Sequence, residues 1–280
     1  MDRIRATQIA SKAIKARKKY LGTGAHVPIC PYTLCEAMGM DLRFVKIPSF
    51  EGMYIADQNL ILISAERPEG RKRFTCAHEI GHHELGHGTI IDEILECGSN
   101  KIEEQEADLF ASMLLMPSSA VTRAVTKYGV SVERLTSDDA YILSKYFGVS
   151  YQAFITHISG NLRLITYKHA QTLKSAKLPD IRKYISGGIT TTHQIFRVGK
   201  WWEEKALDLE VGDFIVSQNE LLTDGPKIFR PIESRGNLFI YEASKPGITR
   251  LYNQDWSSFA KVSRHKFQGF FQYKYDEDDE

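Results

Sequence analysis

The 280-residue sequence predicts an α+β fold made of three successive parts. β-type runs gather between residues 41 and 64, and helical patterns follow from residue 71 to about residue 160. After that come short β-type runs separated by Gly, Pro, Asn and Asp. Strands and helices segregated along the chain are typical of α+β proteins. We therefore expect units at residues 1–117, 118–160 and 161–275, the last mostly β or α+β, with an acidic tail at 276–280.

The composition argues against several classes of protein. Lys and Arg total 36 against 35 Asp and Glu, so the formal net charge of +1 gives no general electrostatic reason to bind nucleic acid. No uncharged apolar run approaches the ~18 residues that cross a bilayer, and the basic N-terminus lacks the apolar stretch of a signal peptide. Four cysteines without a CxxC pair are expected to be free thiols. We expect a cytoplasmic protein without a membrane span.

The first unit is expected to begin with an amphipathic helix over residues 2–20. Its apolar side holds Ile4, Ile9, Ala13 and Ile14. Its cations are expected to extend into water, with a contact to nucleic acid or an acidic partner as the alternative; they are Lys12, Lys15, Arg17, Lys18 and Lys19.

The other elements follow from apolar spacing and from Gly and Pro punctuation. We expect a short helix at 32–38 and strands at 41–47, 52–57 and 59–64, the last two forming a hairpin. A helix at 71–87 is expected to end at Gly88, and a helix at 102–116 is expected to stop at Pro117. Three more helices are expected at 118–128, 137–146 and 150–159. The later β-type runs are LRLITY, HQIFRV, DFIVSQ, NLFIYEAS and FQGFFQYKY.

The most informative motif is HEIGH at residues 78–82. Positions i and i+4 lie on one helix face roughly 6 Å apart, so His78 and His82 can reach one metal ion. Glu79 then lies beside the metal, where a carboxylate can take a proton from water. Histidines on an exposed helix are the alternative. Apolar neighbours argue against it: Phe74, Cys76, Ala77, Ile80 and Leu85.

A third ligand is expected from the helix at 102–116. At 100° per residue Glu104 shares a face with Asp108, Glu103 lies at the margin of that face, and Glu106 points well away. A carboxylate on so apolar a helix is costly unless it binds a cation. Glu104 is therefore the predicted third ligand, and Asp108 is expected to orient a ligand histidine by a hydrogen bond.

A second copy of the motif, HELGH, follows directly at residues 83–87. Its last histidine adjoins the expected helix end, whereas the first copy lies further inside the helix. We therefore assign the metal to the first copy. Cys76 and Cys97 flank the site in sequence and are expected to be buried free thiols rather than redox sensors.

AHEIGHHELGH followed by EEQEADLFASMLLMP resembles the ImmA/IrrE family of zinc metallopeptidases over roughly residues 40–160. The resemblance implies a zincin-like peptidase domain, a helix-turn-helix-like subdomain and a C-terminal GAF-like sensor domain. It implies zinc ligands at His78, His82 and Glu104, with Glu79 as general base. It also implies a partner: a helix-turn-helix repressor that is cleaved to derepress stress or mobile-element genes.

Several alternatives remain open at this stage. His83, His87 and Tyr54 are candidates to stabilise the transition state, and the strand at 59–64 is either a core strand or an edge to which a substrate strand adds. Zn²⁺ is the expected metal, with Mn²⁺ and Fe²⁺ as alternatives. DNA binding is not expected, because the second helix of the helix-turn-helix-like segment, 151–160, carries no Lys or Arg. The rival functions are a DNA-binding regulator with a structural metal, and a sensor or adaptor whose peptidase domain only docks partners. Separately, a small-molecule or signal ligand is a candidate partner of the C-terminal domain.

Overall fold

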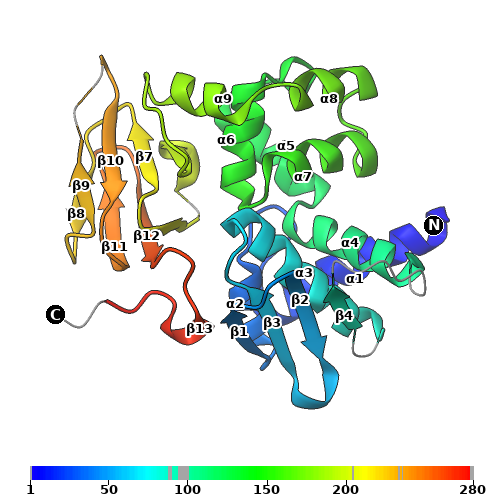
Figure 1. Cartoon of the computed structure of the whole chain (residues 1–280). Helices are drawn as coiled ribbons and strands as arrows, with labels where there is room; N and C mark the ends of the chain where they lie inside the picture. The colour runs from blue at the N-terminus through cyan, green and yellow to red at the C-terminus, as the bar shows by residue number, and fades with distance from the viewer. Residues whose placement is uncertain are drawn as a thin grey trace.

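The computed structural model describes residues 2–87, 90–93, 101–203, 205–232, 234 and 236–277, with the backbone alone at 90–93 and 101. Within these residues the chain is a mixed helix and sheet structure with three sheets. The sheets have the strand orders β13-β1-β3-β2-β4, β5-β7-β10-β9 and β6-β12-β11-β8. The α+β prediction is confirmed at this level. Figure 1 shows the first sheet below the helical middle of the chain, with the other two sheets to one side.

The first sheet and its helices come from the N-terminal part of the chain. The helices are α1 (Arg3–Leu21), α2 (Pro31–Ala37), α3 (Glu69–Leu85) and α4 (Lys101–Leu115). The strands are β1 (Asp41–Val45), β2 (Phe50–Ile55), β3 (Leu60–Ser64) and β4 (Ile90–Glu93). β3 pairs with β1 in parallel and with β2 in antiparallel fashion, so it is an interior strand. The idea that the 59–64 strand is an exposed edge is therefore wrong.

The prediction that all basic side chains of α1 extend into water is wrong for Arg17. Asp2 caps the helix by accepting from the backbone N–H of Arg5. The Arg17 side chain is fully buried and donates to the carbonyl oxygens of Leu114, Gly24 and Val27. Arg17 thus fixes α1 against the end of α4, because a buried guanidinium needs carbonyl partners for its donors. Ile4, expected on the apolar side, is exposed.

The helical middle follows the predicted order. It contains α5 (Ser118–Tyr128), α6 (Ser137–Phe147) and α7 (Tyr151–Thr156), which continues as a π-helical turn at His157–Asn161. Gly148 has φ of +66° at the turn between α6 and α7, and Ser150 caps α7 as expected. The LRLITY run is not a strand; it leads into α8 (Tyr167–Lys174), which α9 (Leu178–Ile185) follows. The helix-turn-helix interpretation of α6 and α7 stays a prediction.

Strands β5 to β12 form the second and third sheets, whereas β13 belongs to the first sheet. They are β5 (Ile195–Val198), β6 (Leu207–Glu210), β7 (Phe214–Ser217), β8 (Leu222–Asp224), β9 (Phe229–Pro231), β10 (Phe239–Ala243), β11 (Gly247–Tyr252) and β12 (Ser257–Ser263). β13 (Gly269–Phe270) returns to the first sheet and pairs with β1. β13 therefore lies beside α2 and β1 in Figure 1, and the chain then runs on away from them. The GAF-like interpretation of the C-terminal part stays a prediction.

One described stretch, Ile102–Tyr128, is apolar enough to pass a test for a membrane span, with a mean hydropathy of 1.2. It consists of α4 and α5, and 61% of its most apolar window is buried inside the protein. A buried core segment of a soluble protein gives the same signal, so the stretch is weak evidence for a span. Cys30, Cys35 and Cys76 are free thiols, whereas Cys97 and the end of the acidic tail lie outside the described residues.

Candidate metal centre

The close crossing of α3 and α4 brings the predicted ligands together. Gly81 lies at this crossing: a Cβ there would lie 3.2 Å from the Cα of Ala107 and 3.2 Å from the ring of Phe110. The missing side chain therefore lets the two helix backbones approach each other. α3 ends at Leu85 with Gly86 in the left-handed conformation, not at Gly88, which lies outside the described residues.

Three donor groups converge at this crossing. The Nε2 atoms of His78 and His82 lie 2.9 Å apart. The Glu104 carboxylate lies 3.1 Å from His78 Nε2 and 3.5 Å from His82 Nε2. Zinc–ligand bonds of about 2.0–2.1 Å in tetrahedral geometry separate neighbouring ligand atoms by about 3.3 Å. The three separations are close to that value, so the donor set fits a small divalent cation.

The electronic state of the two histidines also suits metal binding. Asp108 Oδ1 lies 3.0 Å from His78 Nδ1, so with a metal held at Nε2 the Nδ1–H would donate to this carboxylate and the ring would be fixed in place. His82 is 1% exposed, and burial together with the neighbouring His78 lowers its pKa to about 4. Its ring is neutral at pH 7, as a metal ligand must be.

Glu79 lies beside this cluster on the buried side of α3, 1% exposed. Strand β2 crosses directly over it at Gly52, where a Cβ would overlap the Thr75 methyl and lie 2.9 Å from Glu79 Oε1. The glycine leaves space for the carboxylate between helix and strand. Our sequence reasoning missed Gly52, although a glycine inside a strand often marks close approach of another group.

The second motif copy takes different partners. His83 Nδ1 lies 2.7 Å from the Tyr54 hydroxyl on β2, so these two candidate transition-state donors contact each other. His87 Nδ1 lies 3.0 Å from His82 Nδ1, and its Nε2 lies 3.3 Å from Glu106. Among the described side chains, the group that the structure brings into ligand geometry is His78, His82 and Glu104.

A series of polar contacts leads from the cluster to α1: His82 contacts His87, His87 contacts Glu106, and Glu106 pairs with Arg5. Glu106 is not part of the ligand group; it is buried and paired with Arg5 of α1 as well as with His87. Arg5 and His87 hold the pKa of the Glu106 carboxyl below its usual range, mainly through the Arg5 hydrogen bond. No sequence pattern indicated Arg5, because its partner Glu106 lies 101 positions away.

The geometry of the ligand helices agrees with the comparison to known families. Residues 35–159 match the model of the IrrE N-terminal-like domain. Over these residues the chain is similar to the ImmA/IrrE family. The resemblance drawn from the two helix motifs is thereby confirmed, and it extends from α2 to the π-helical turn after α7.

Two curated relatives, both named radiation response metalloprotease IrrE, align with about the same length of chain. The protein of Deinococcus radiodurans is 34% identical over 131 residues, which cover 43% of this chain and 39% of the relative. The protein of Deinococcus deserti is 32% identical over 130 residues, covering 43% of this chain and 46% of the relative. The matches thus span less than half the length of either relative.

A solved structure described as a Mycobacterium tuberculosis transcriptional regulator is 16% identical, with a TM-score of 0.38. The similarity covers 55% of this chain and 46% of that one, and at this TM-score it carries no argument.

Proposed function

We propose that this protein is a zinc-dependent endopeptidase. The observation that carries the proposal is the convergence of His78, His82 and Glu104 beside the buried carboxylate of Glu79. Two imidazoles and one carboxylate leave a coordination position for water or substrate, as in catalytic zinc sites. The name of the curated relatives, radiation response metalloprotease, points to the same activity.

Each side chain has a defined part in the proposed reaction. A bound zinc ion would supply a water of pKa about 7 and polarise the peptide carbonyl. Glu79 accepts the proton of the attacking water and delivers it to the leaving amine. Asp108 holds the His78 ring by its Nδ1–H, and the Tyr54–His83 pair is the candidate donor to the developing oxyanion.

The proposed substrate is a cytoplasmic helix-turn-helix repressor whose cleavage derepresses stress or mobile-element genes. This part rests on the match of residues 35–159 to the IrrE N-terminal-like domain and on the radiation response named for the relatives. A small-molecule signal acting on the C-terminal part would fit the same role. DNA binding by the chain itself finds no support in α7, which carries no Lys or Arg.

The decisive experiment compares wild type with Glu79→Gln. Glu84→Gln is the matched control, because Glu84 holds the corresponding position in the second motif copy. Each protein is loaded with Zn²⁺, Mn²⁺ or Fe²⁺, its metal content is measured, and it is incubated with the repressor encoded nearest to this gene. We expect Glu79→Gln to bind metal but lose cleavage at least 10²-fold, and Glu84→Gln to cleave normally.

Two results would contradict the proposal: equal cleavage by wild type and Glu79→Gln, or no cleavage by a fully loaded wild type. Specific duplex binding that survives Glu79→Gln and weakens with salt would favour the rival DNA-binding regulator. An unchanged biological output in the Glu79→Gln strain would favour the sensor or adaptor.

A further inference from the structure

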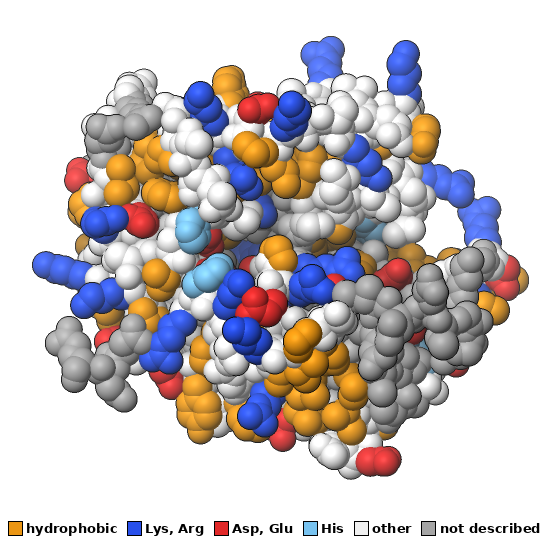
Figure 2. Space-filling view, viewed as in Figure 1, with side chains coloured by type: hydrophobic (Ala, Val, Ile, Leu, Met, Phe, Trp, Pro, Cys, Tyr) orange, Lys and Arg blue, Asp and Glu red, His pale blue; other side chains and the backbone are white. Residues whose placement is uncertain are grey.

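A second buried site lies where three parts of the chain meet. A cavity of about 220 Å³ is enclosed by the start of α3, the turn between α6 and α7, α9, and the C-terminal part around Trp202 and Asp213. Figure 2 shows the surface hollowed between the helical middle and the α3 side, with Lys and Arg side chains beside the hollow. The cavity is separate from the metal centre, since none of His78, His82, Glu104 or Glu79 lines it.

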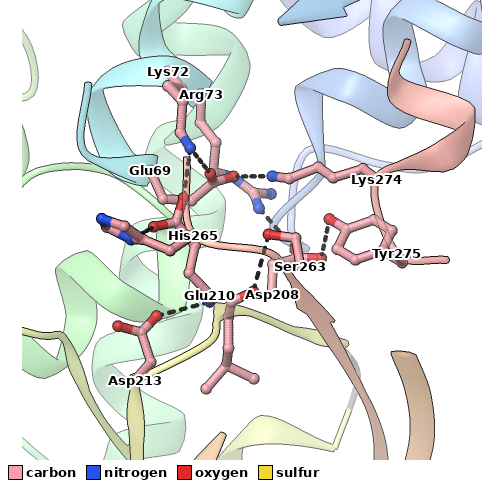
Figure 3. A network of polar contacts seen from close by, with 11 residues as sticks. Glu69, Lys72, Arg73, Asp208, Glu210, Asp213, Ser263, His265, Lys274 and Tyr275 are labelled. Carbon is pink, nitrogen blue, oxygen red and sulfur yellow. Dashed lines mark hydrogen bonds and ion pairs between the residues drawn. The ribbon is translucent and has the colours of Figure 1, made fainter. Parts of the chain in front are cut away.

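Basic side chains outnumber acidic ones in the cavity wall. Glu69, Asp208 and Asp213 are its acidic residues, against five cations: Arg71, Arg73, Lys145, Arg182 and Lys205. Two of the three acids are already paired, as Figure 3 shows. Glu69 accepts from Lys274 at 2.8 Å and pairs with Lys72 at 3.0 Å. Asp208 accepts from Arg73 Nη1 at 2.7 Å and from the Tyr275 hydroxyl at 3.1 Å.

Asp213 does little to offset this charge. Its carboxylate accepts from the backbone N–H groups of Gln194 and Glu210. Burial nevertheless raises the pKa of Asp213 to about 7, so the group is only partly ionised at neutral pH. Burial likewise lowers the pKa of Lys145 to about 8 and that of Lys205 to about 7. Both the acid and the two lysines are thus incompletely ionised at neutral pH, and a bound anion would favour the charged forms of the lysines.

Several donors in this wall have no acceptor. Arg73 Nε and Nη2, Arg182 Nε and Trp202 Nε1 are buried and make no hydrogen bond to any described residue. Arg73 and Trp202 are each 1% exposed, so water on the outer surface does not satisfy them. Buried polar groups in folded proteins are almost always paired, and unpaired donors of three residues at one cavity indicate an acceptor-rich occupant.

We propose that this cavity binds a compact dianion with several oxygen acceptors, in the size range from inorganic phosphate to a four-carbon dicarboxylate. Such a ligand supplies acceptors to Arg73, Arg182 and Trp202 and a counter-charge to Lys145 and Lys205. It also touches the first turn of α3, the helix that carries His78 and His82. Occupancy of the cavity thus regulates cleavage at the metal centre, and this last point alone rests on the proposed peptidase function.

The test uses the full chain, with inorganic phosphate and succinate as the two probes. Thermal unfolding is followed from 0.1 to 10 mM of each, against sodium chloride of equal ionic strength, and the better probe is titrated by calorimetry. We expect a saturable rise in Tm with at least one probe. Phosphate alone acting would identify a phosphate-bearing ligand, and succinate alone would identify a dicarboxylate.

Three variants place the binding in the cavity. Lys145→Met removes a half-buried cation with little change of shape, so it abolishes the response while leaving the ligand-free Tm equal or higher. Trp202→Phe removes the Nε1 donor and weakens binding about 10-fold. Lys177→Met removes an exposed cation just before α9 and leaves the response unchanged. The retained Tm of Lys145→Met separates lost binding from lost folding.

Two outcomes overturn the site: no response of the wild type to either probe at 10 mM, or equal responses of wild type and Lys145→Met. Regulation is tested separately by the rate of repressor cleavage with and without the bound anion, where we expect at least a threefold change. If the protein binds the anion but cleaves no repressor, the proposed peptidase function is refuted and the proposed anion site is not. An unchanged rate in an active peptidase would overturn the regulation only.

Discussion

Gly52 is the residue at which one methyl group most directly disturbs the candidate catalytic carboxylate. In Gly52→Ala the new Cβ meets the Thr75 methyl and lies 2.9 Å from Glu79 Oε1. Overpacking of this kind costs about 1–3 kcal/mol, and here it also displaces the general base. We expect a lower Tm and a cleavage rate reduced at least tenfold, with zinc content unchanged because the three ligands lie elsewhere. Rates and metal content of the purified variant check this.

Thr75→Ser provides the control for that variant, since it removes the methyl that the new Cβ meets. The double variant Gly52→Ala/Thr75→Ser should recover most of the lost Tm but not the rate, because the contact with Glu79 persists. Full activity in Gly52→Ala would mean that the carboxylate does not act from the position seen here.

Asp108 is expected to act on the metal through His78. Its side chain is 62% exposed, yet Oδ1 is 3.0 Å from His78 Nδ1. Removing such an outer partner typically lowers metal affinity 10–100-fold. We expect that loss in Asp108→Ala and a smaller one in Asp108→Asn, whose amide oxygen still accepts from Nδ1–H. Competition with a chromophoric zinc chelator measures both. Wild-type affinity in Asp108→Ala would contradict the orienting role.

At the scale of elements, His157 links the end of α4 to the turn that follows α7. Its Nε2 donates to the Met116 carbonyl at 2.7 Å, and its Nδ1 lies 3.0 Å from Asn161 Nδ2. Burial lowers the pKa of His157 from 6.5 to about 4, although the Met116 hydrogen bond opposes the shift. The unfolded chain therefore binds the proton more readily between pH 6.5 and pH 4. Stability is present above pH 6.5 and is lost as the pH falls toward 4.

This shift gives a quantitative prediction. Between pH 7 and pH 5 the free energy of unfolding should fall by about 2 kcal/mol through His157 alone. His157→Gln keeps an N–H donor for Met116 but does not titrate, so it should lose this part of the pH dependence. Urea unfolding at both pH values measures the difference, with exposed His26→Gln as the control. Equal pH dependence in wild type and His157→Gln would refute the assignment.

Elements were predictable where the signal is local. α4 follows from its apolar spacing and Pro117, and the start of α7 follows from its Ser150 cap. The strand prediction for LRLITY was wrong. Its β-branched residues favour a strand, but the Thr166 side chain instead caps α8 by accepting from His169 N–H. The interior place of β3 depends on pairing with β1 and β2, which no local pattern records.

The residues of the candidate site likewise fall into those that a local pattern predicts and those that depend on tertiary packing. His78, Glu79 and His82 are set by the period of one helix, and the same period places Glu104 on one face of the next helix with Asp108. Burial was the weaker guide, because the Glu104 side chain is 33% exposed. Arg5 and Gly52 take part only because α1 and β2 pack against those helices. Such residues depend on tertiary contacts, so spacing in the sequence does not predict them.

At the scale of the whole molecule, the C-terminal end closes the structure onto the N-terminal sheet. Gly269 and Phe270 pair with Phe44 and Arg43 of β1. The ring of Phe271 then packs 5.4 Å from that of Tyr32 on α2. Sequence reasoning placed this segment with the C-terminal strands, because a two-residue strand carries almost no pattern of its own. The metal-bearing part and the C-terminal part therefore share a sheet as well as the ion network of Figure 3.

Lys274 tests whether this closure stabilises the chain as one cooperative unit. Its ammonium is buried, pairs with Glu69 on the first turn of α3, and lies 4.8 Å from the centre of the Tyr32 ring. Burial alone would raise the pKa of Glu69, but Lys274, Lys72 and Arg73 outweigh it and hold that pKa well below its usual range. Removing one partner of a buried pair leaves an uncompensated charge, so Lys274→Met should cost about 3 kcal/mol in urea unfolding. The double variant Glu69→Gln/Lys274→Met should recover part of that loss, because no lone carboxylate remains. A single variant within 0.5 kcal/mol of wild type, a difference about the size of a neutral surface substitution, would mean that the chain end is only loosely attached to α3.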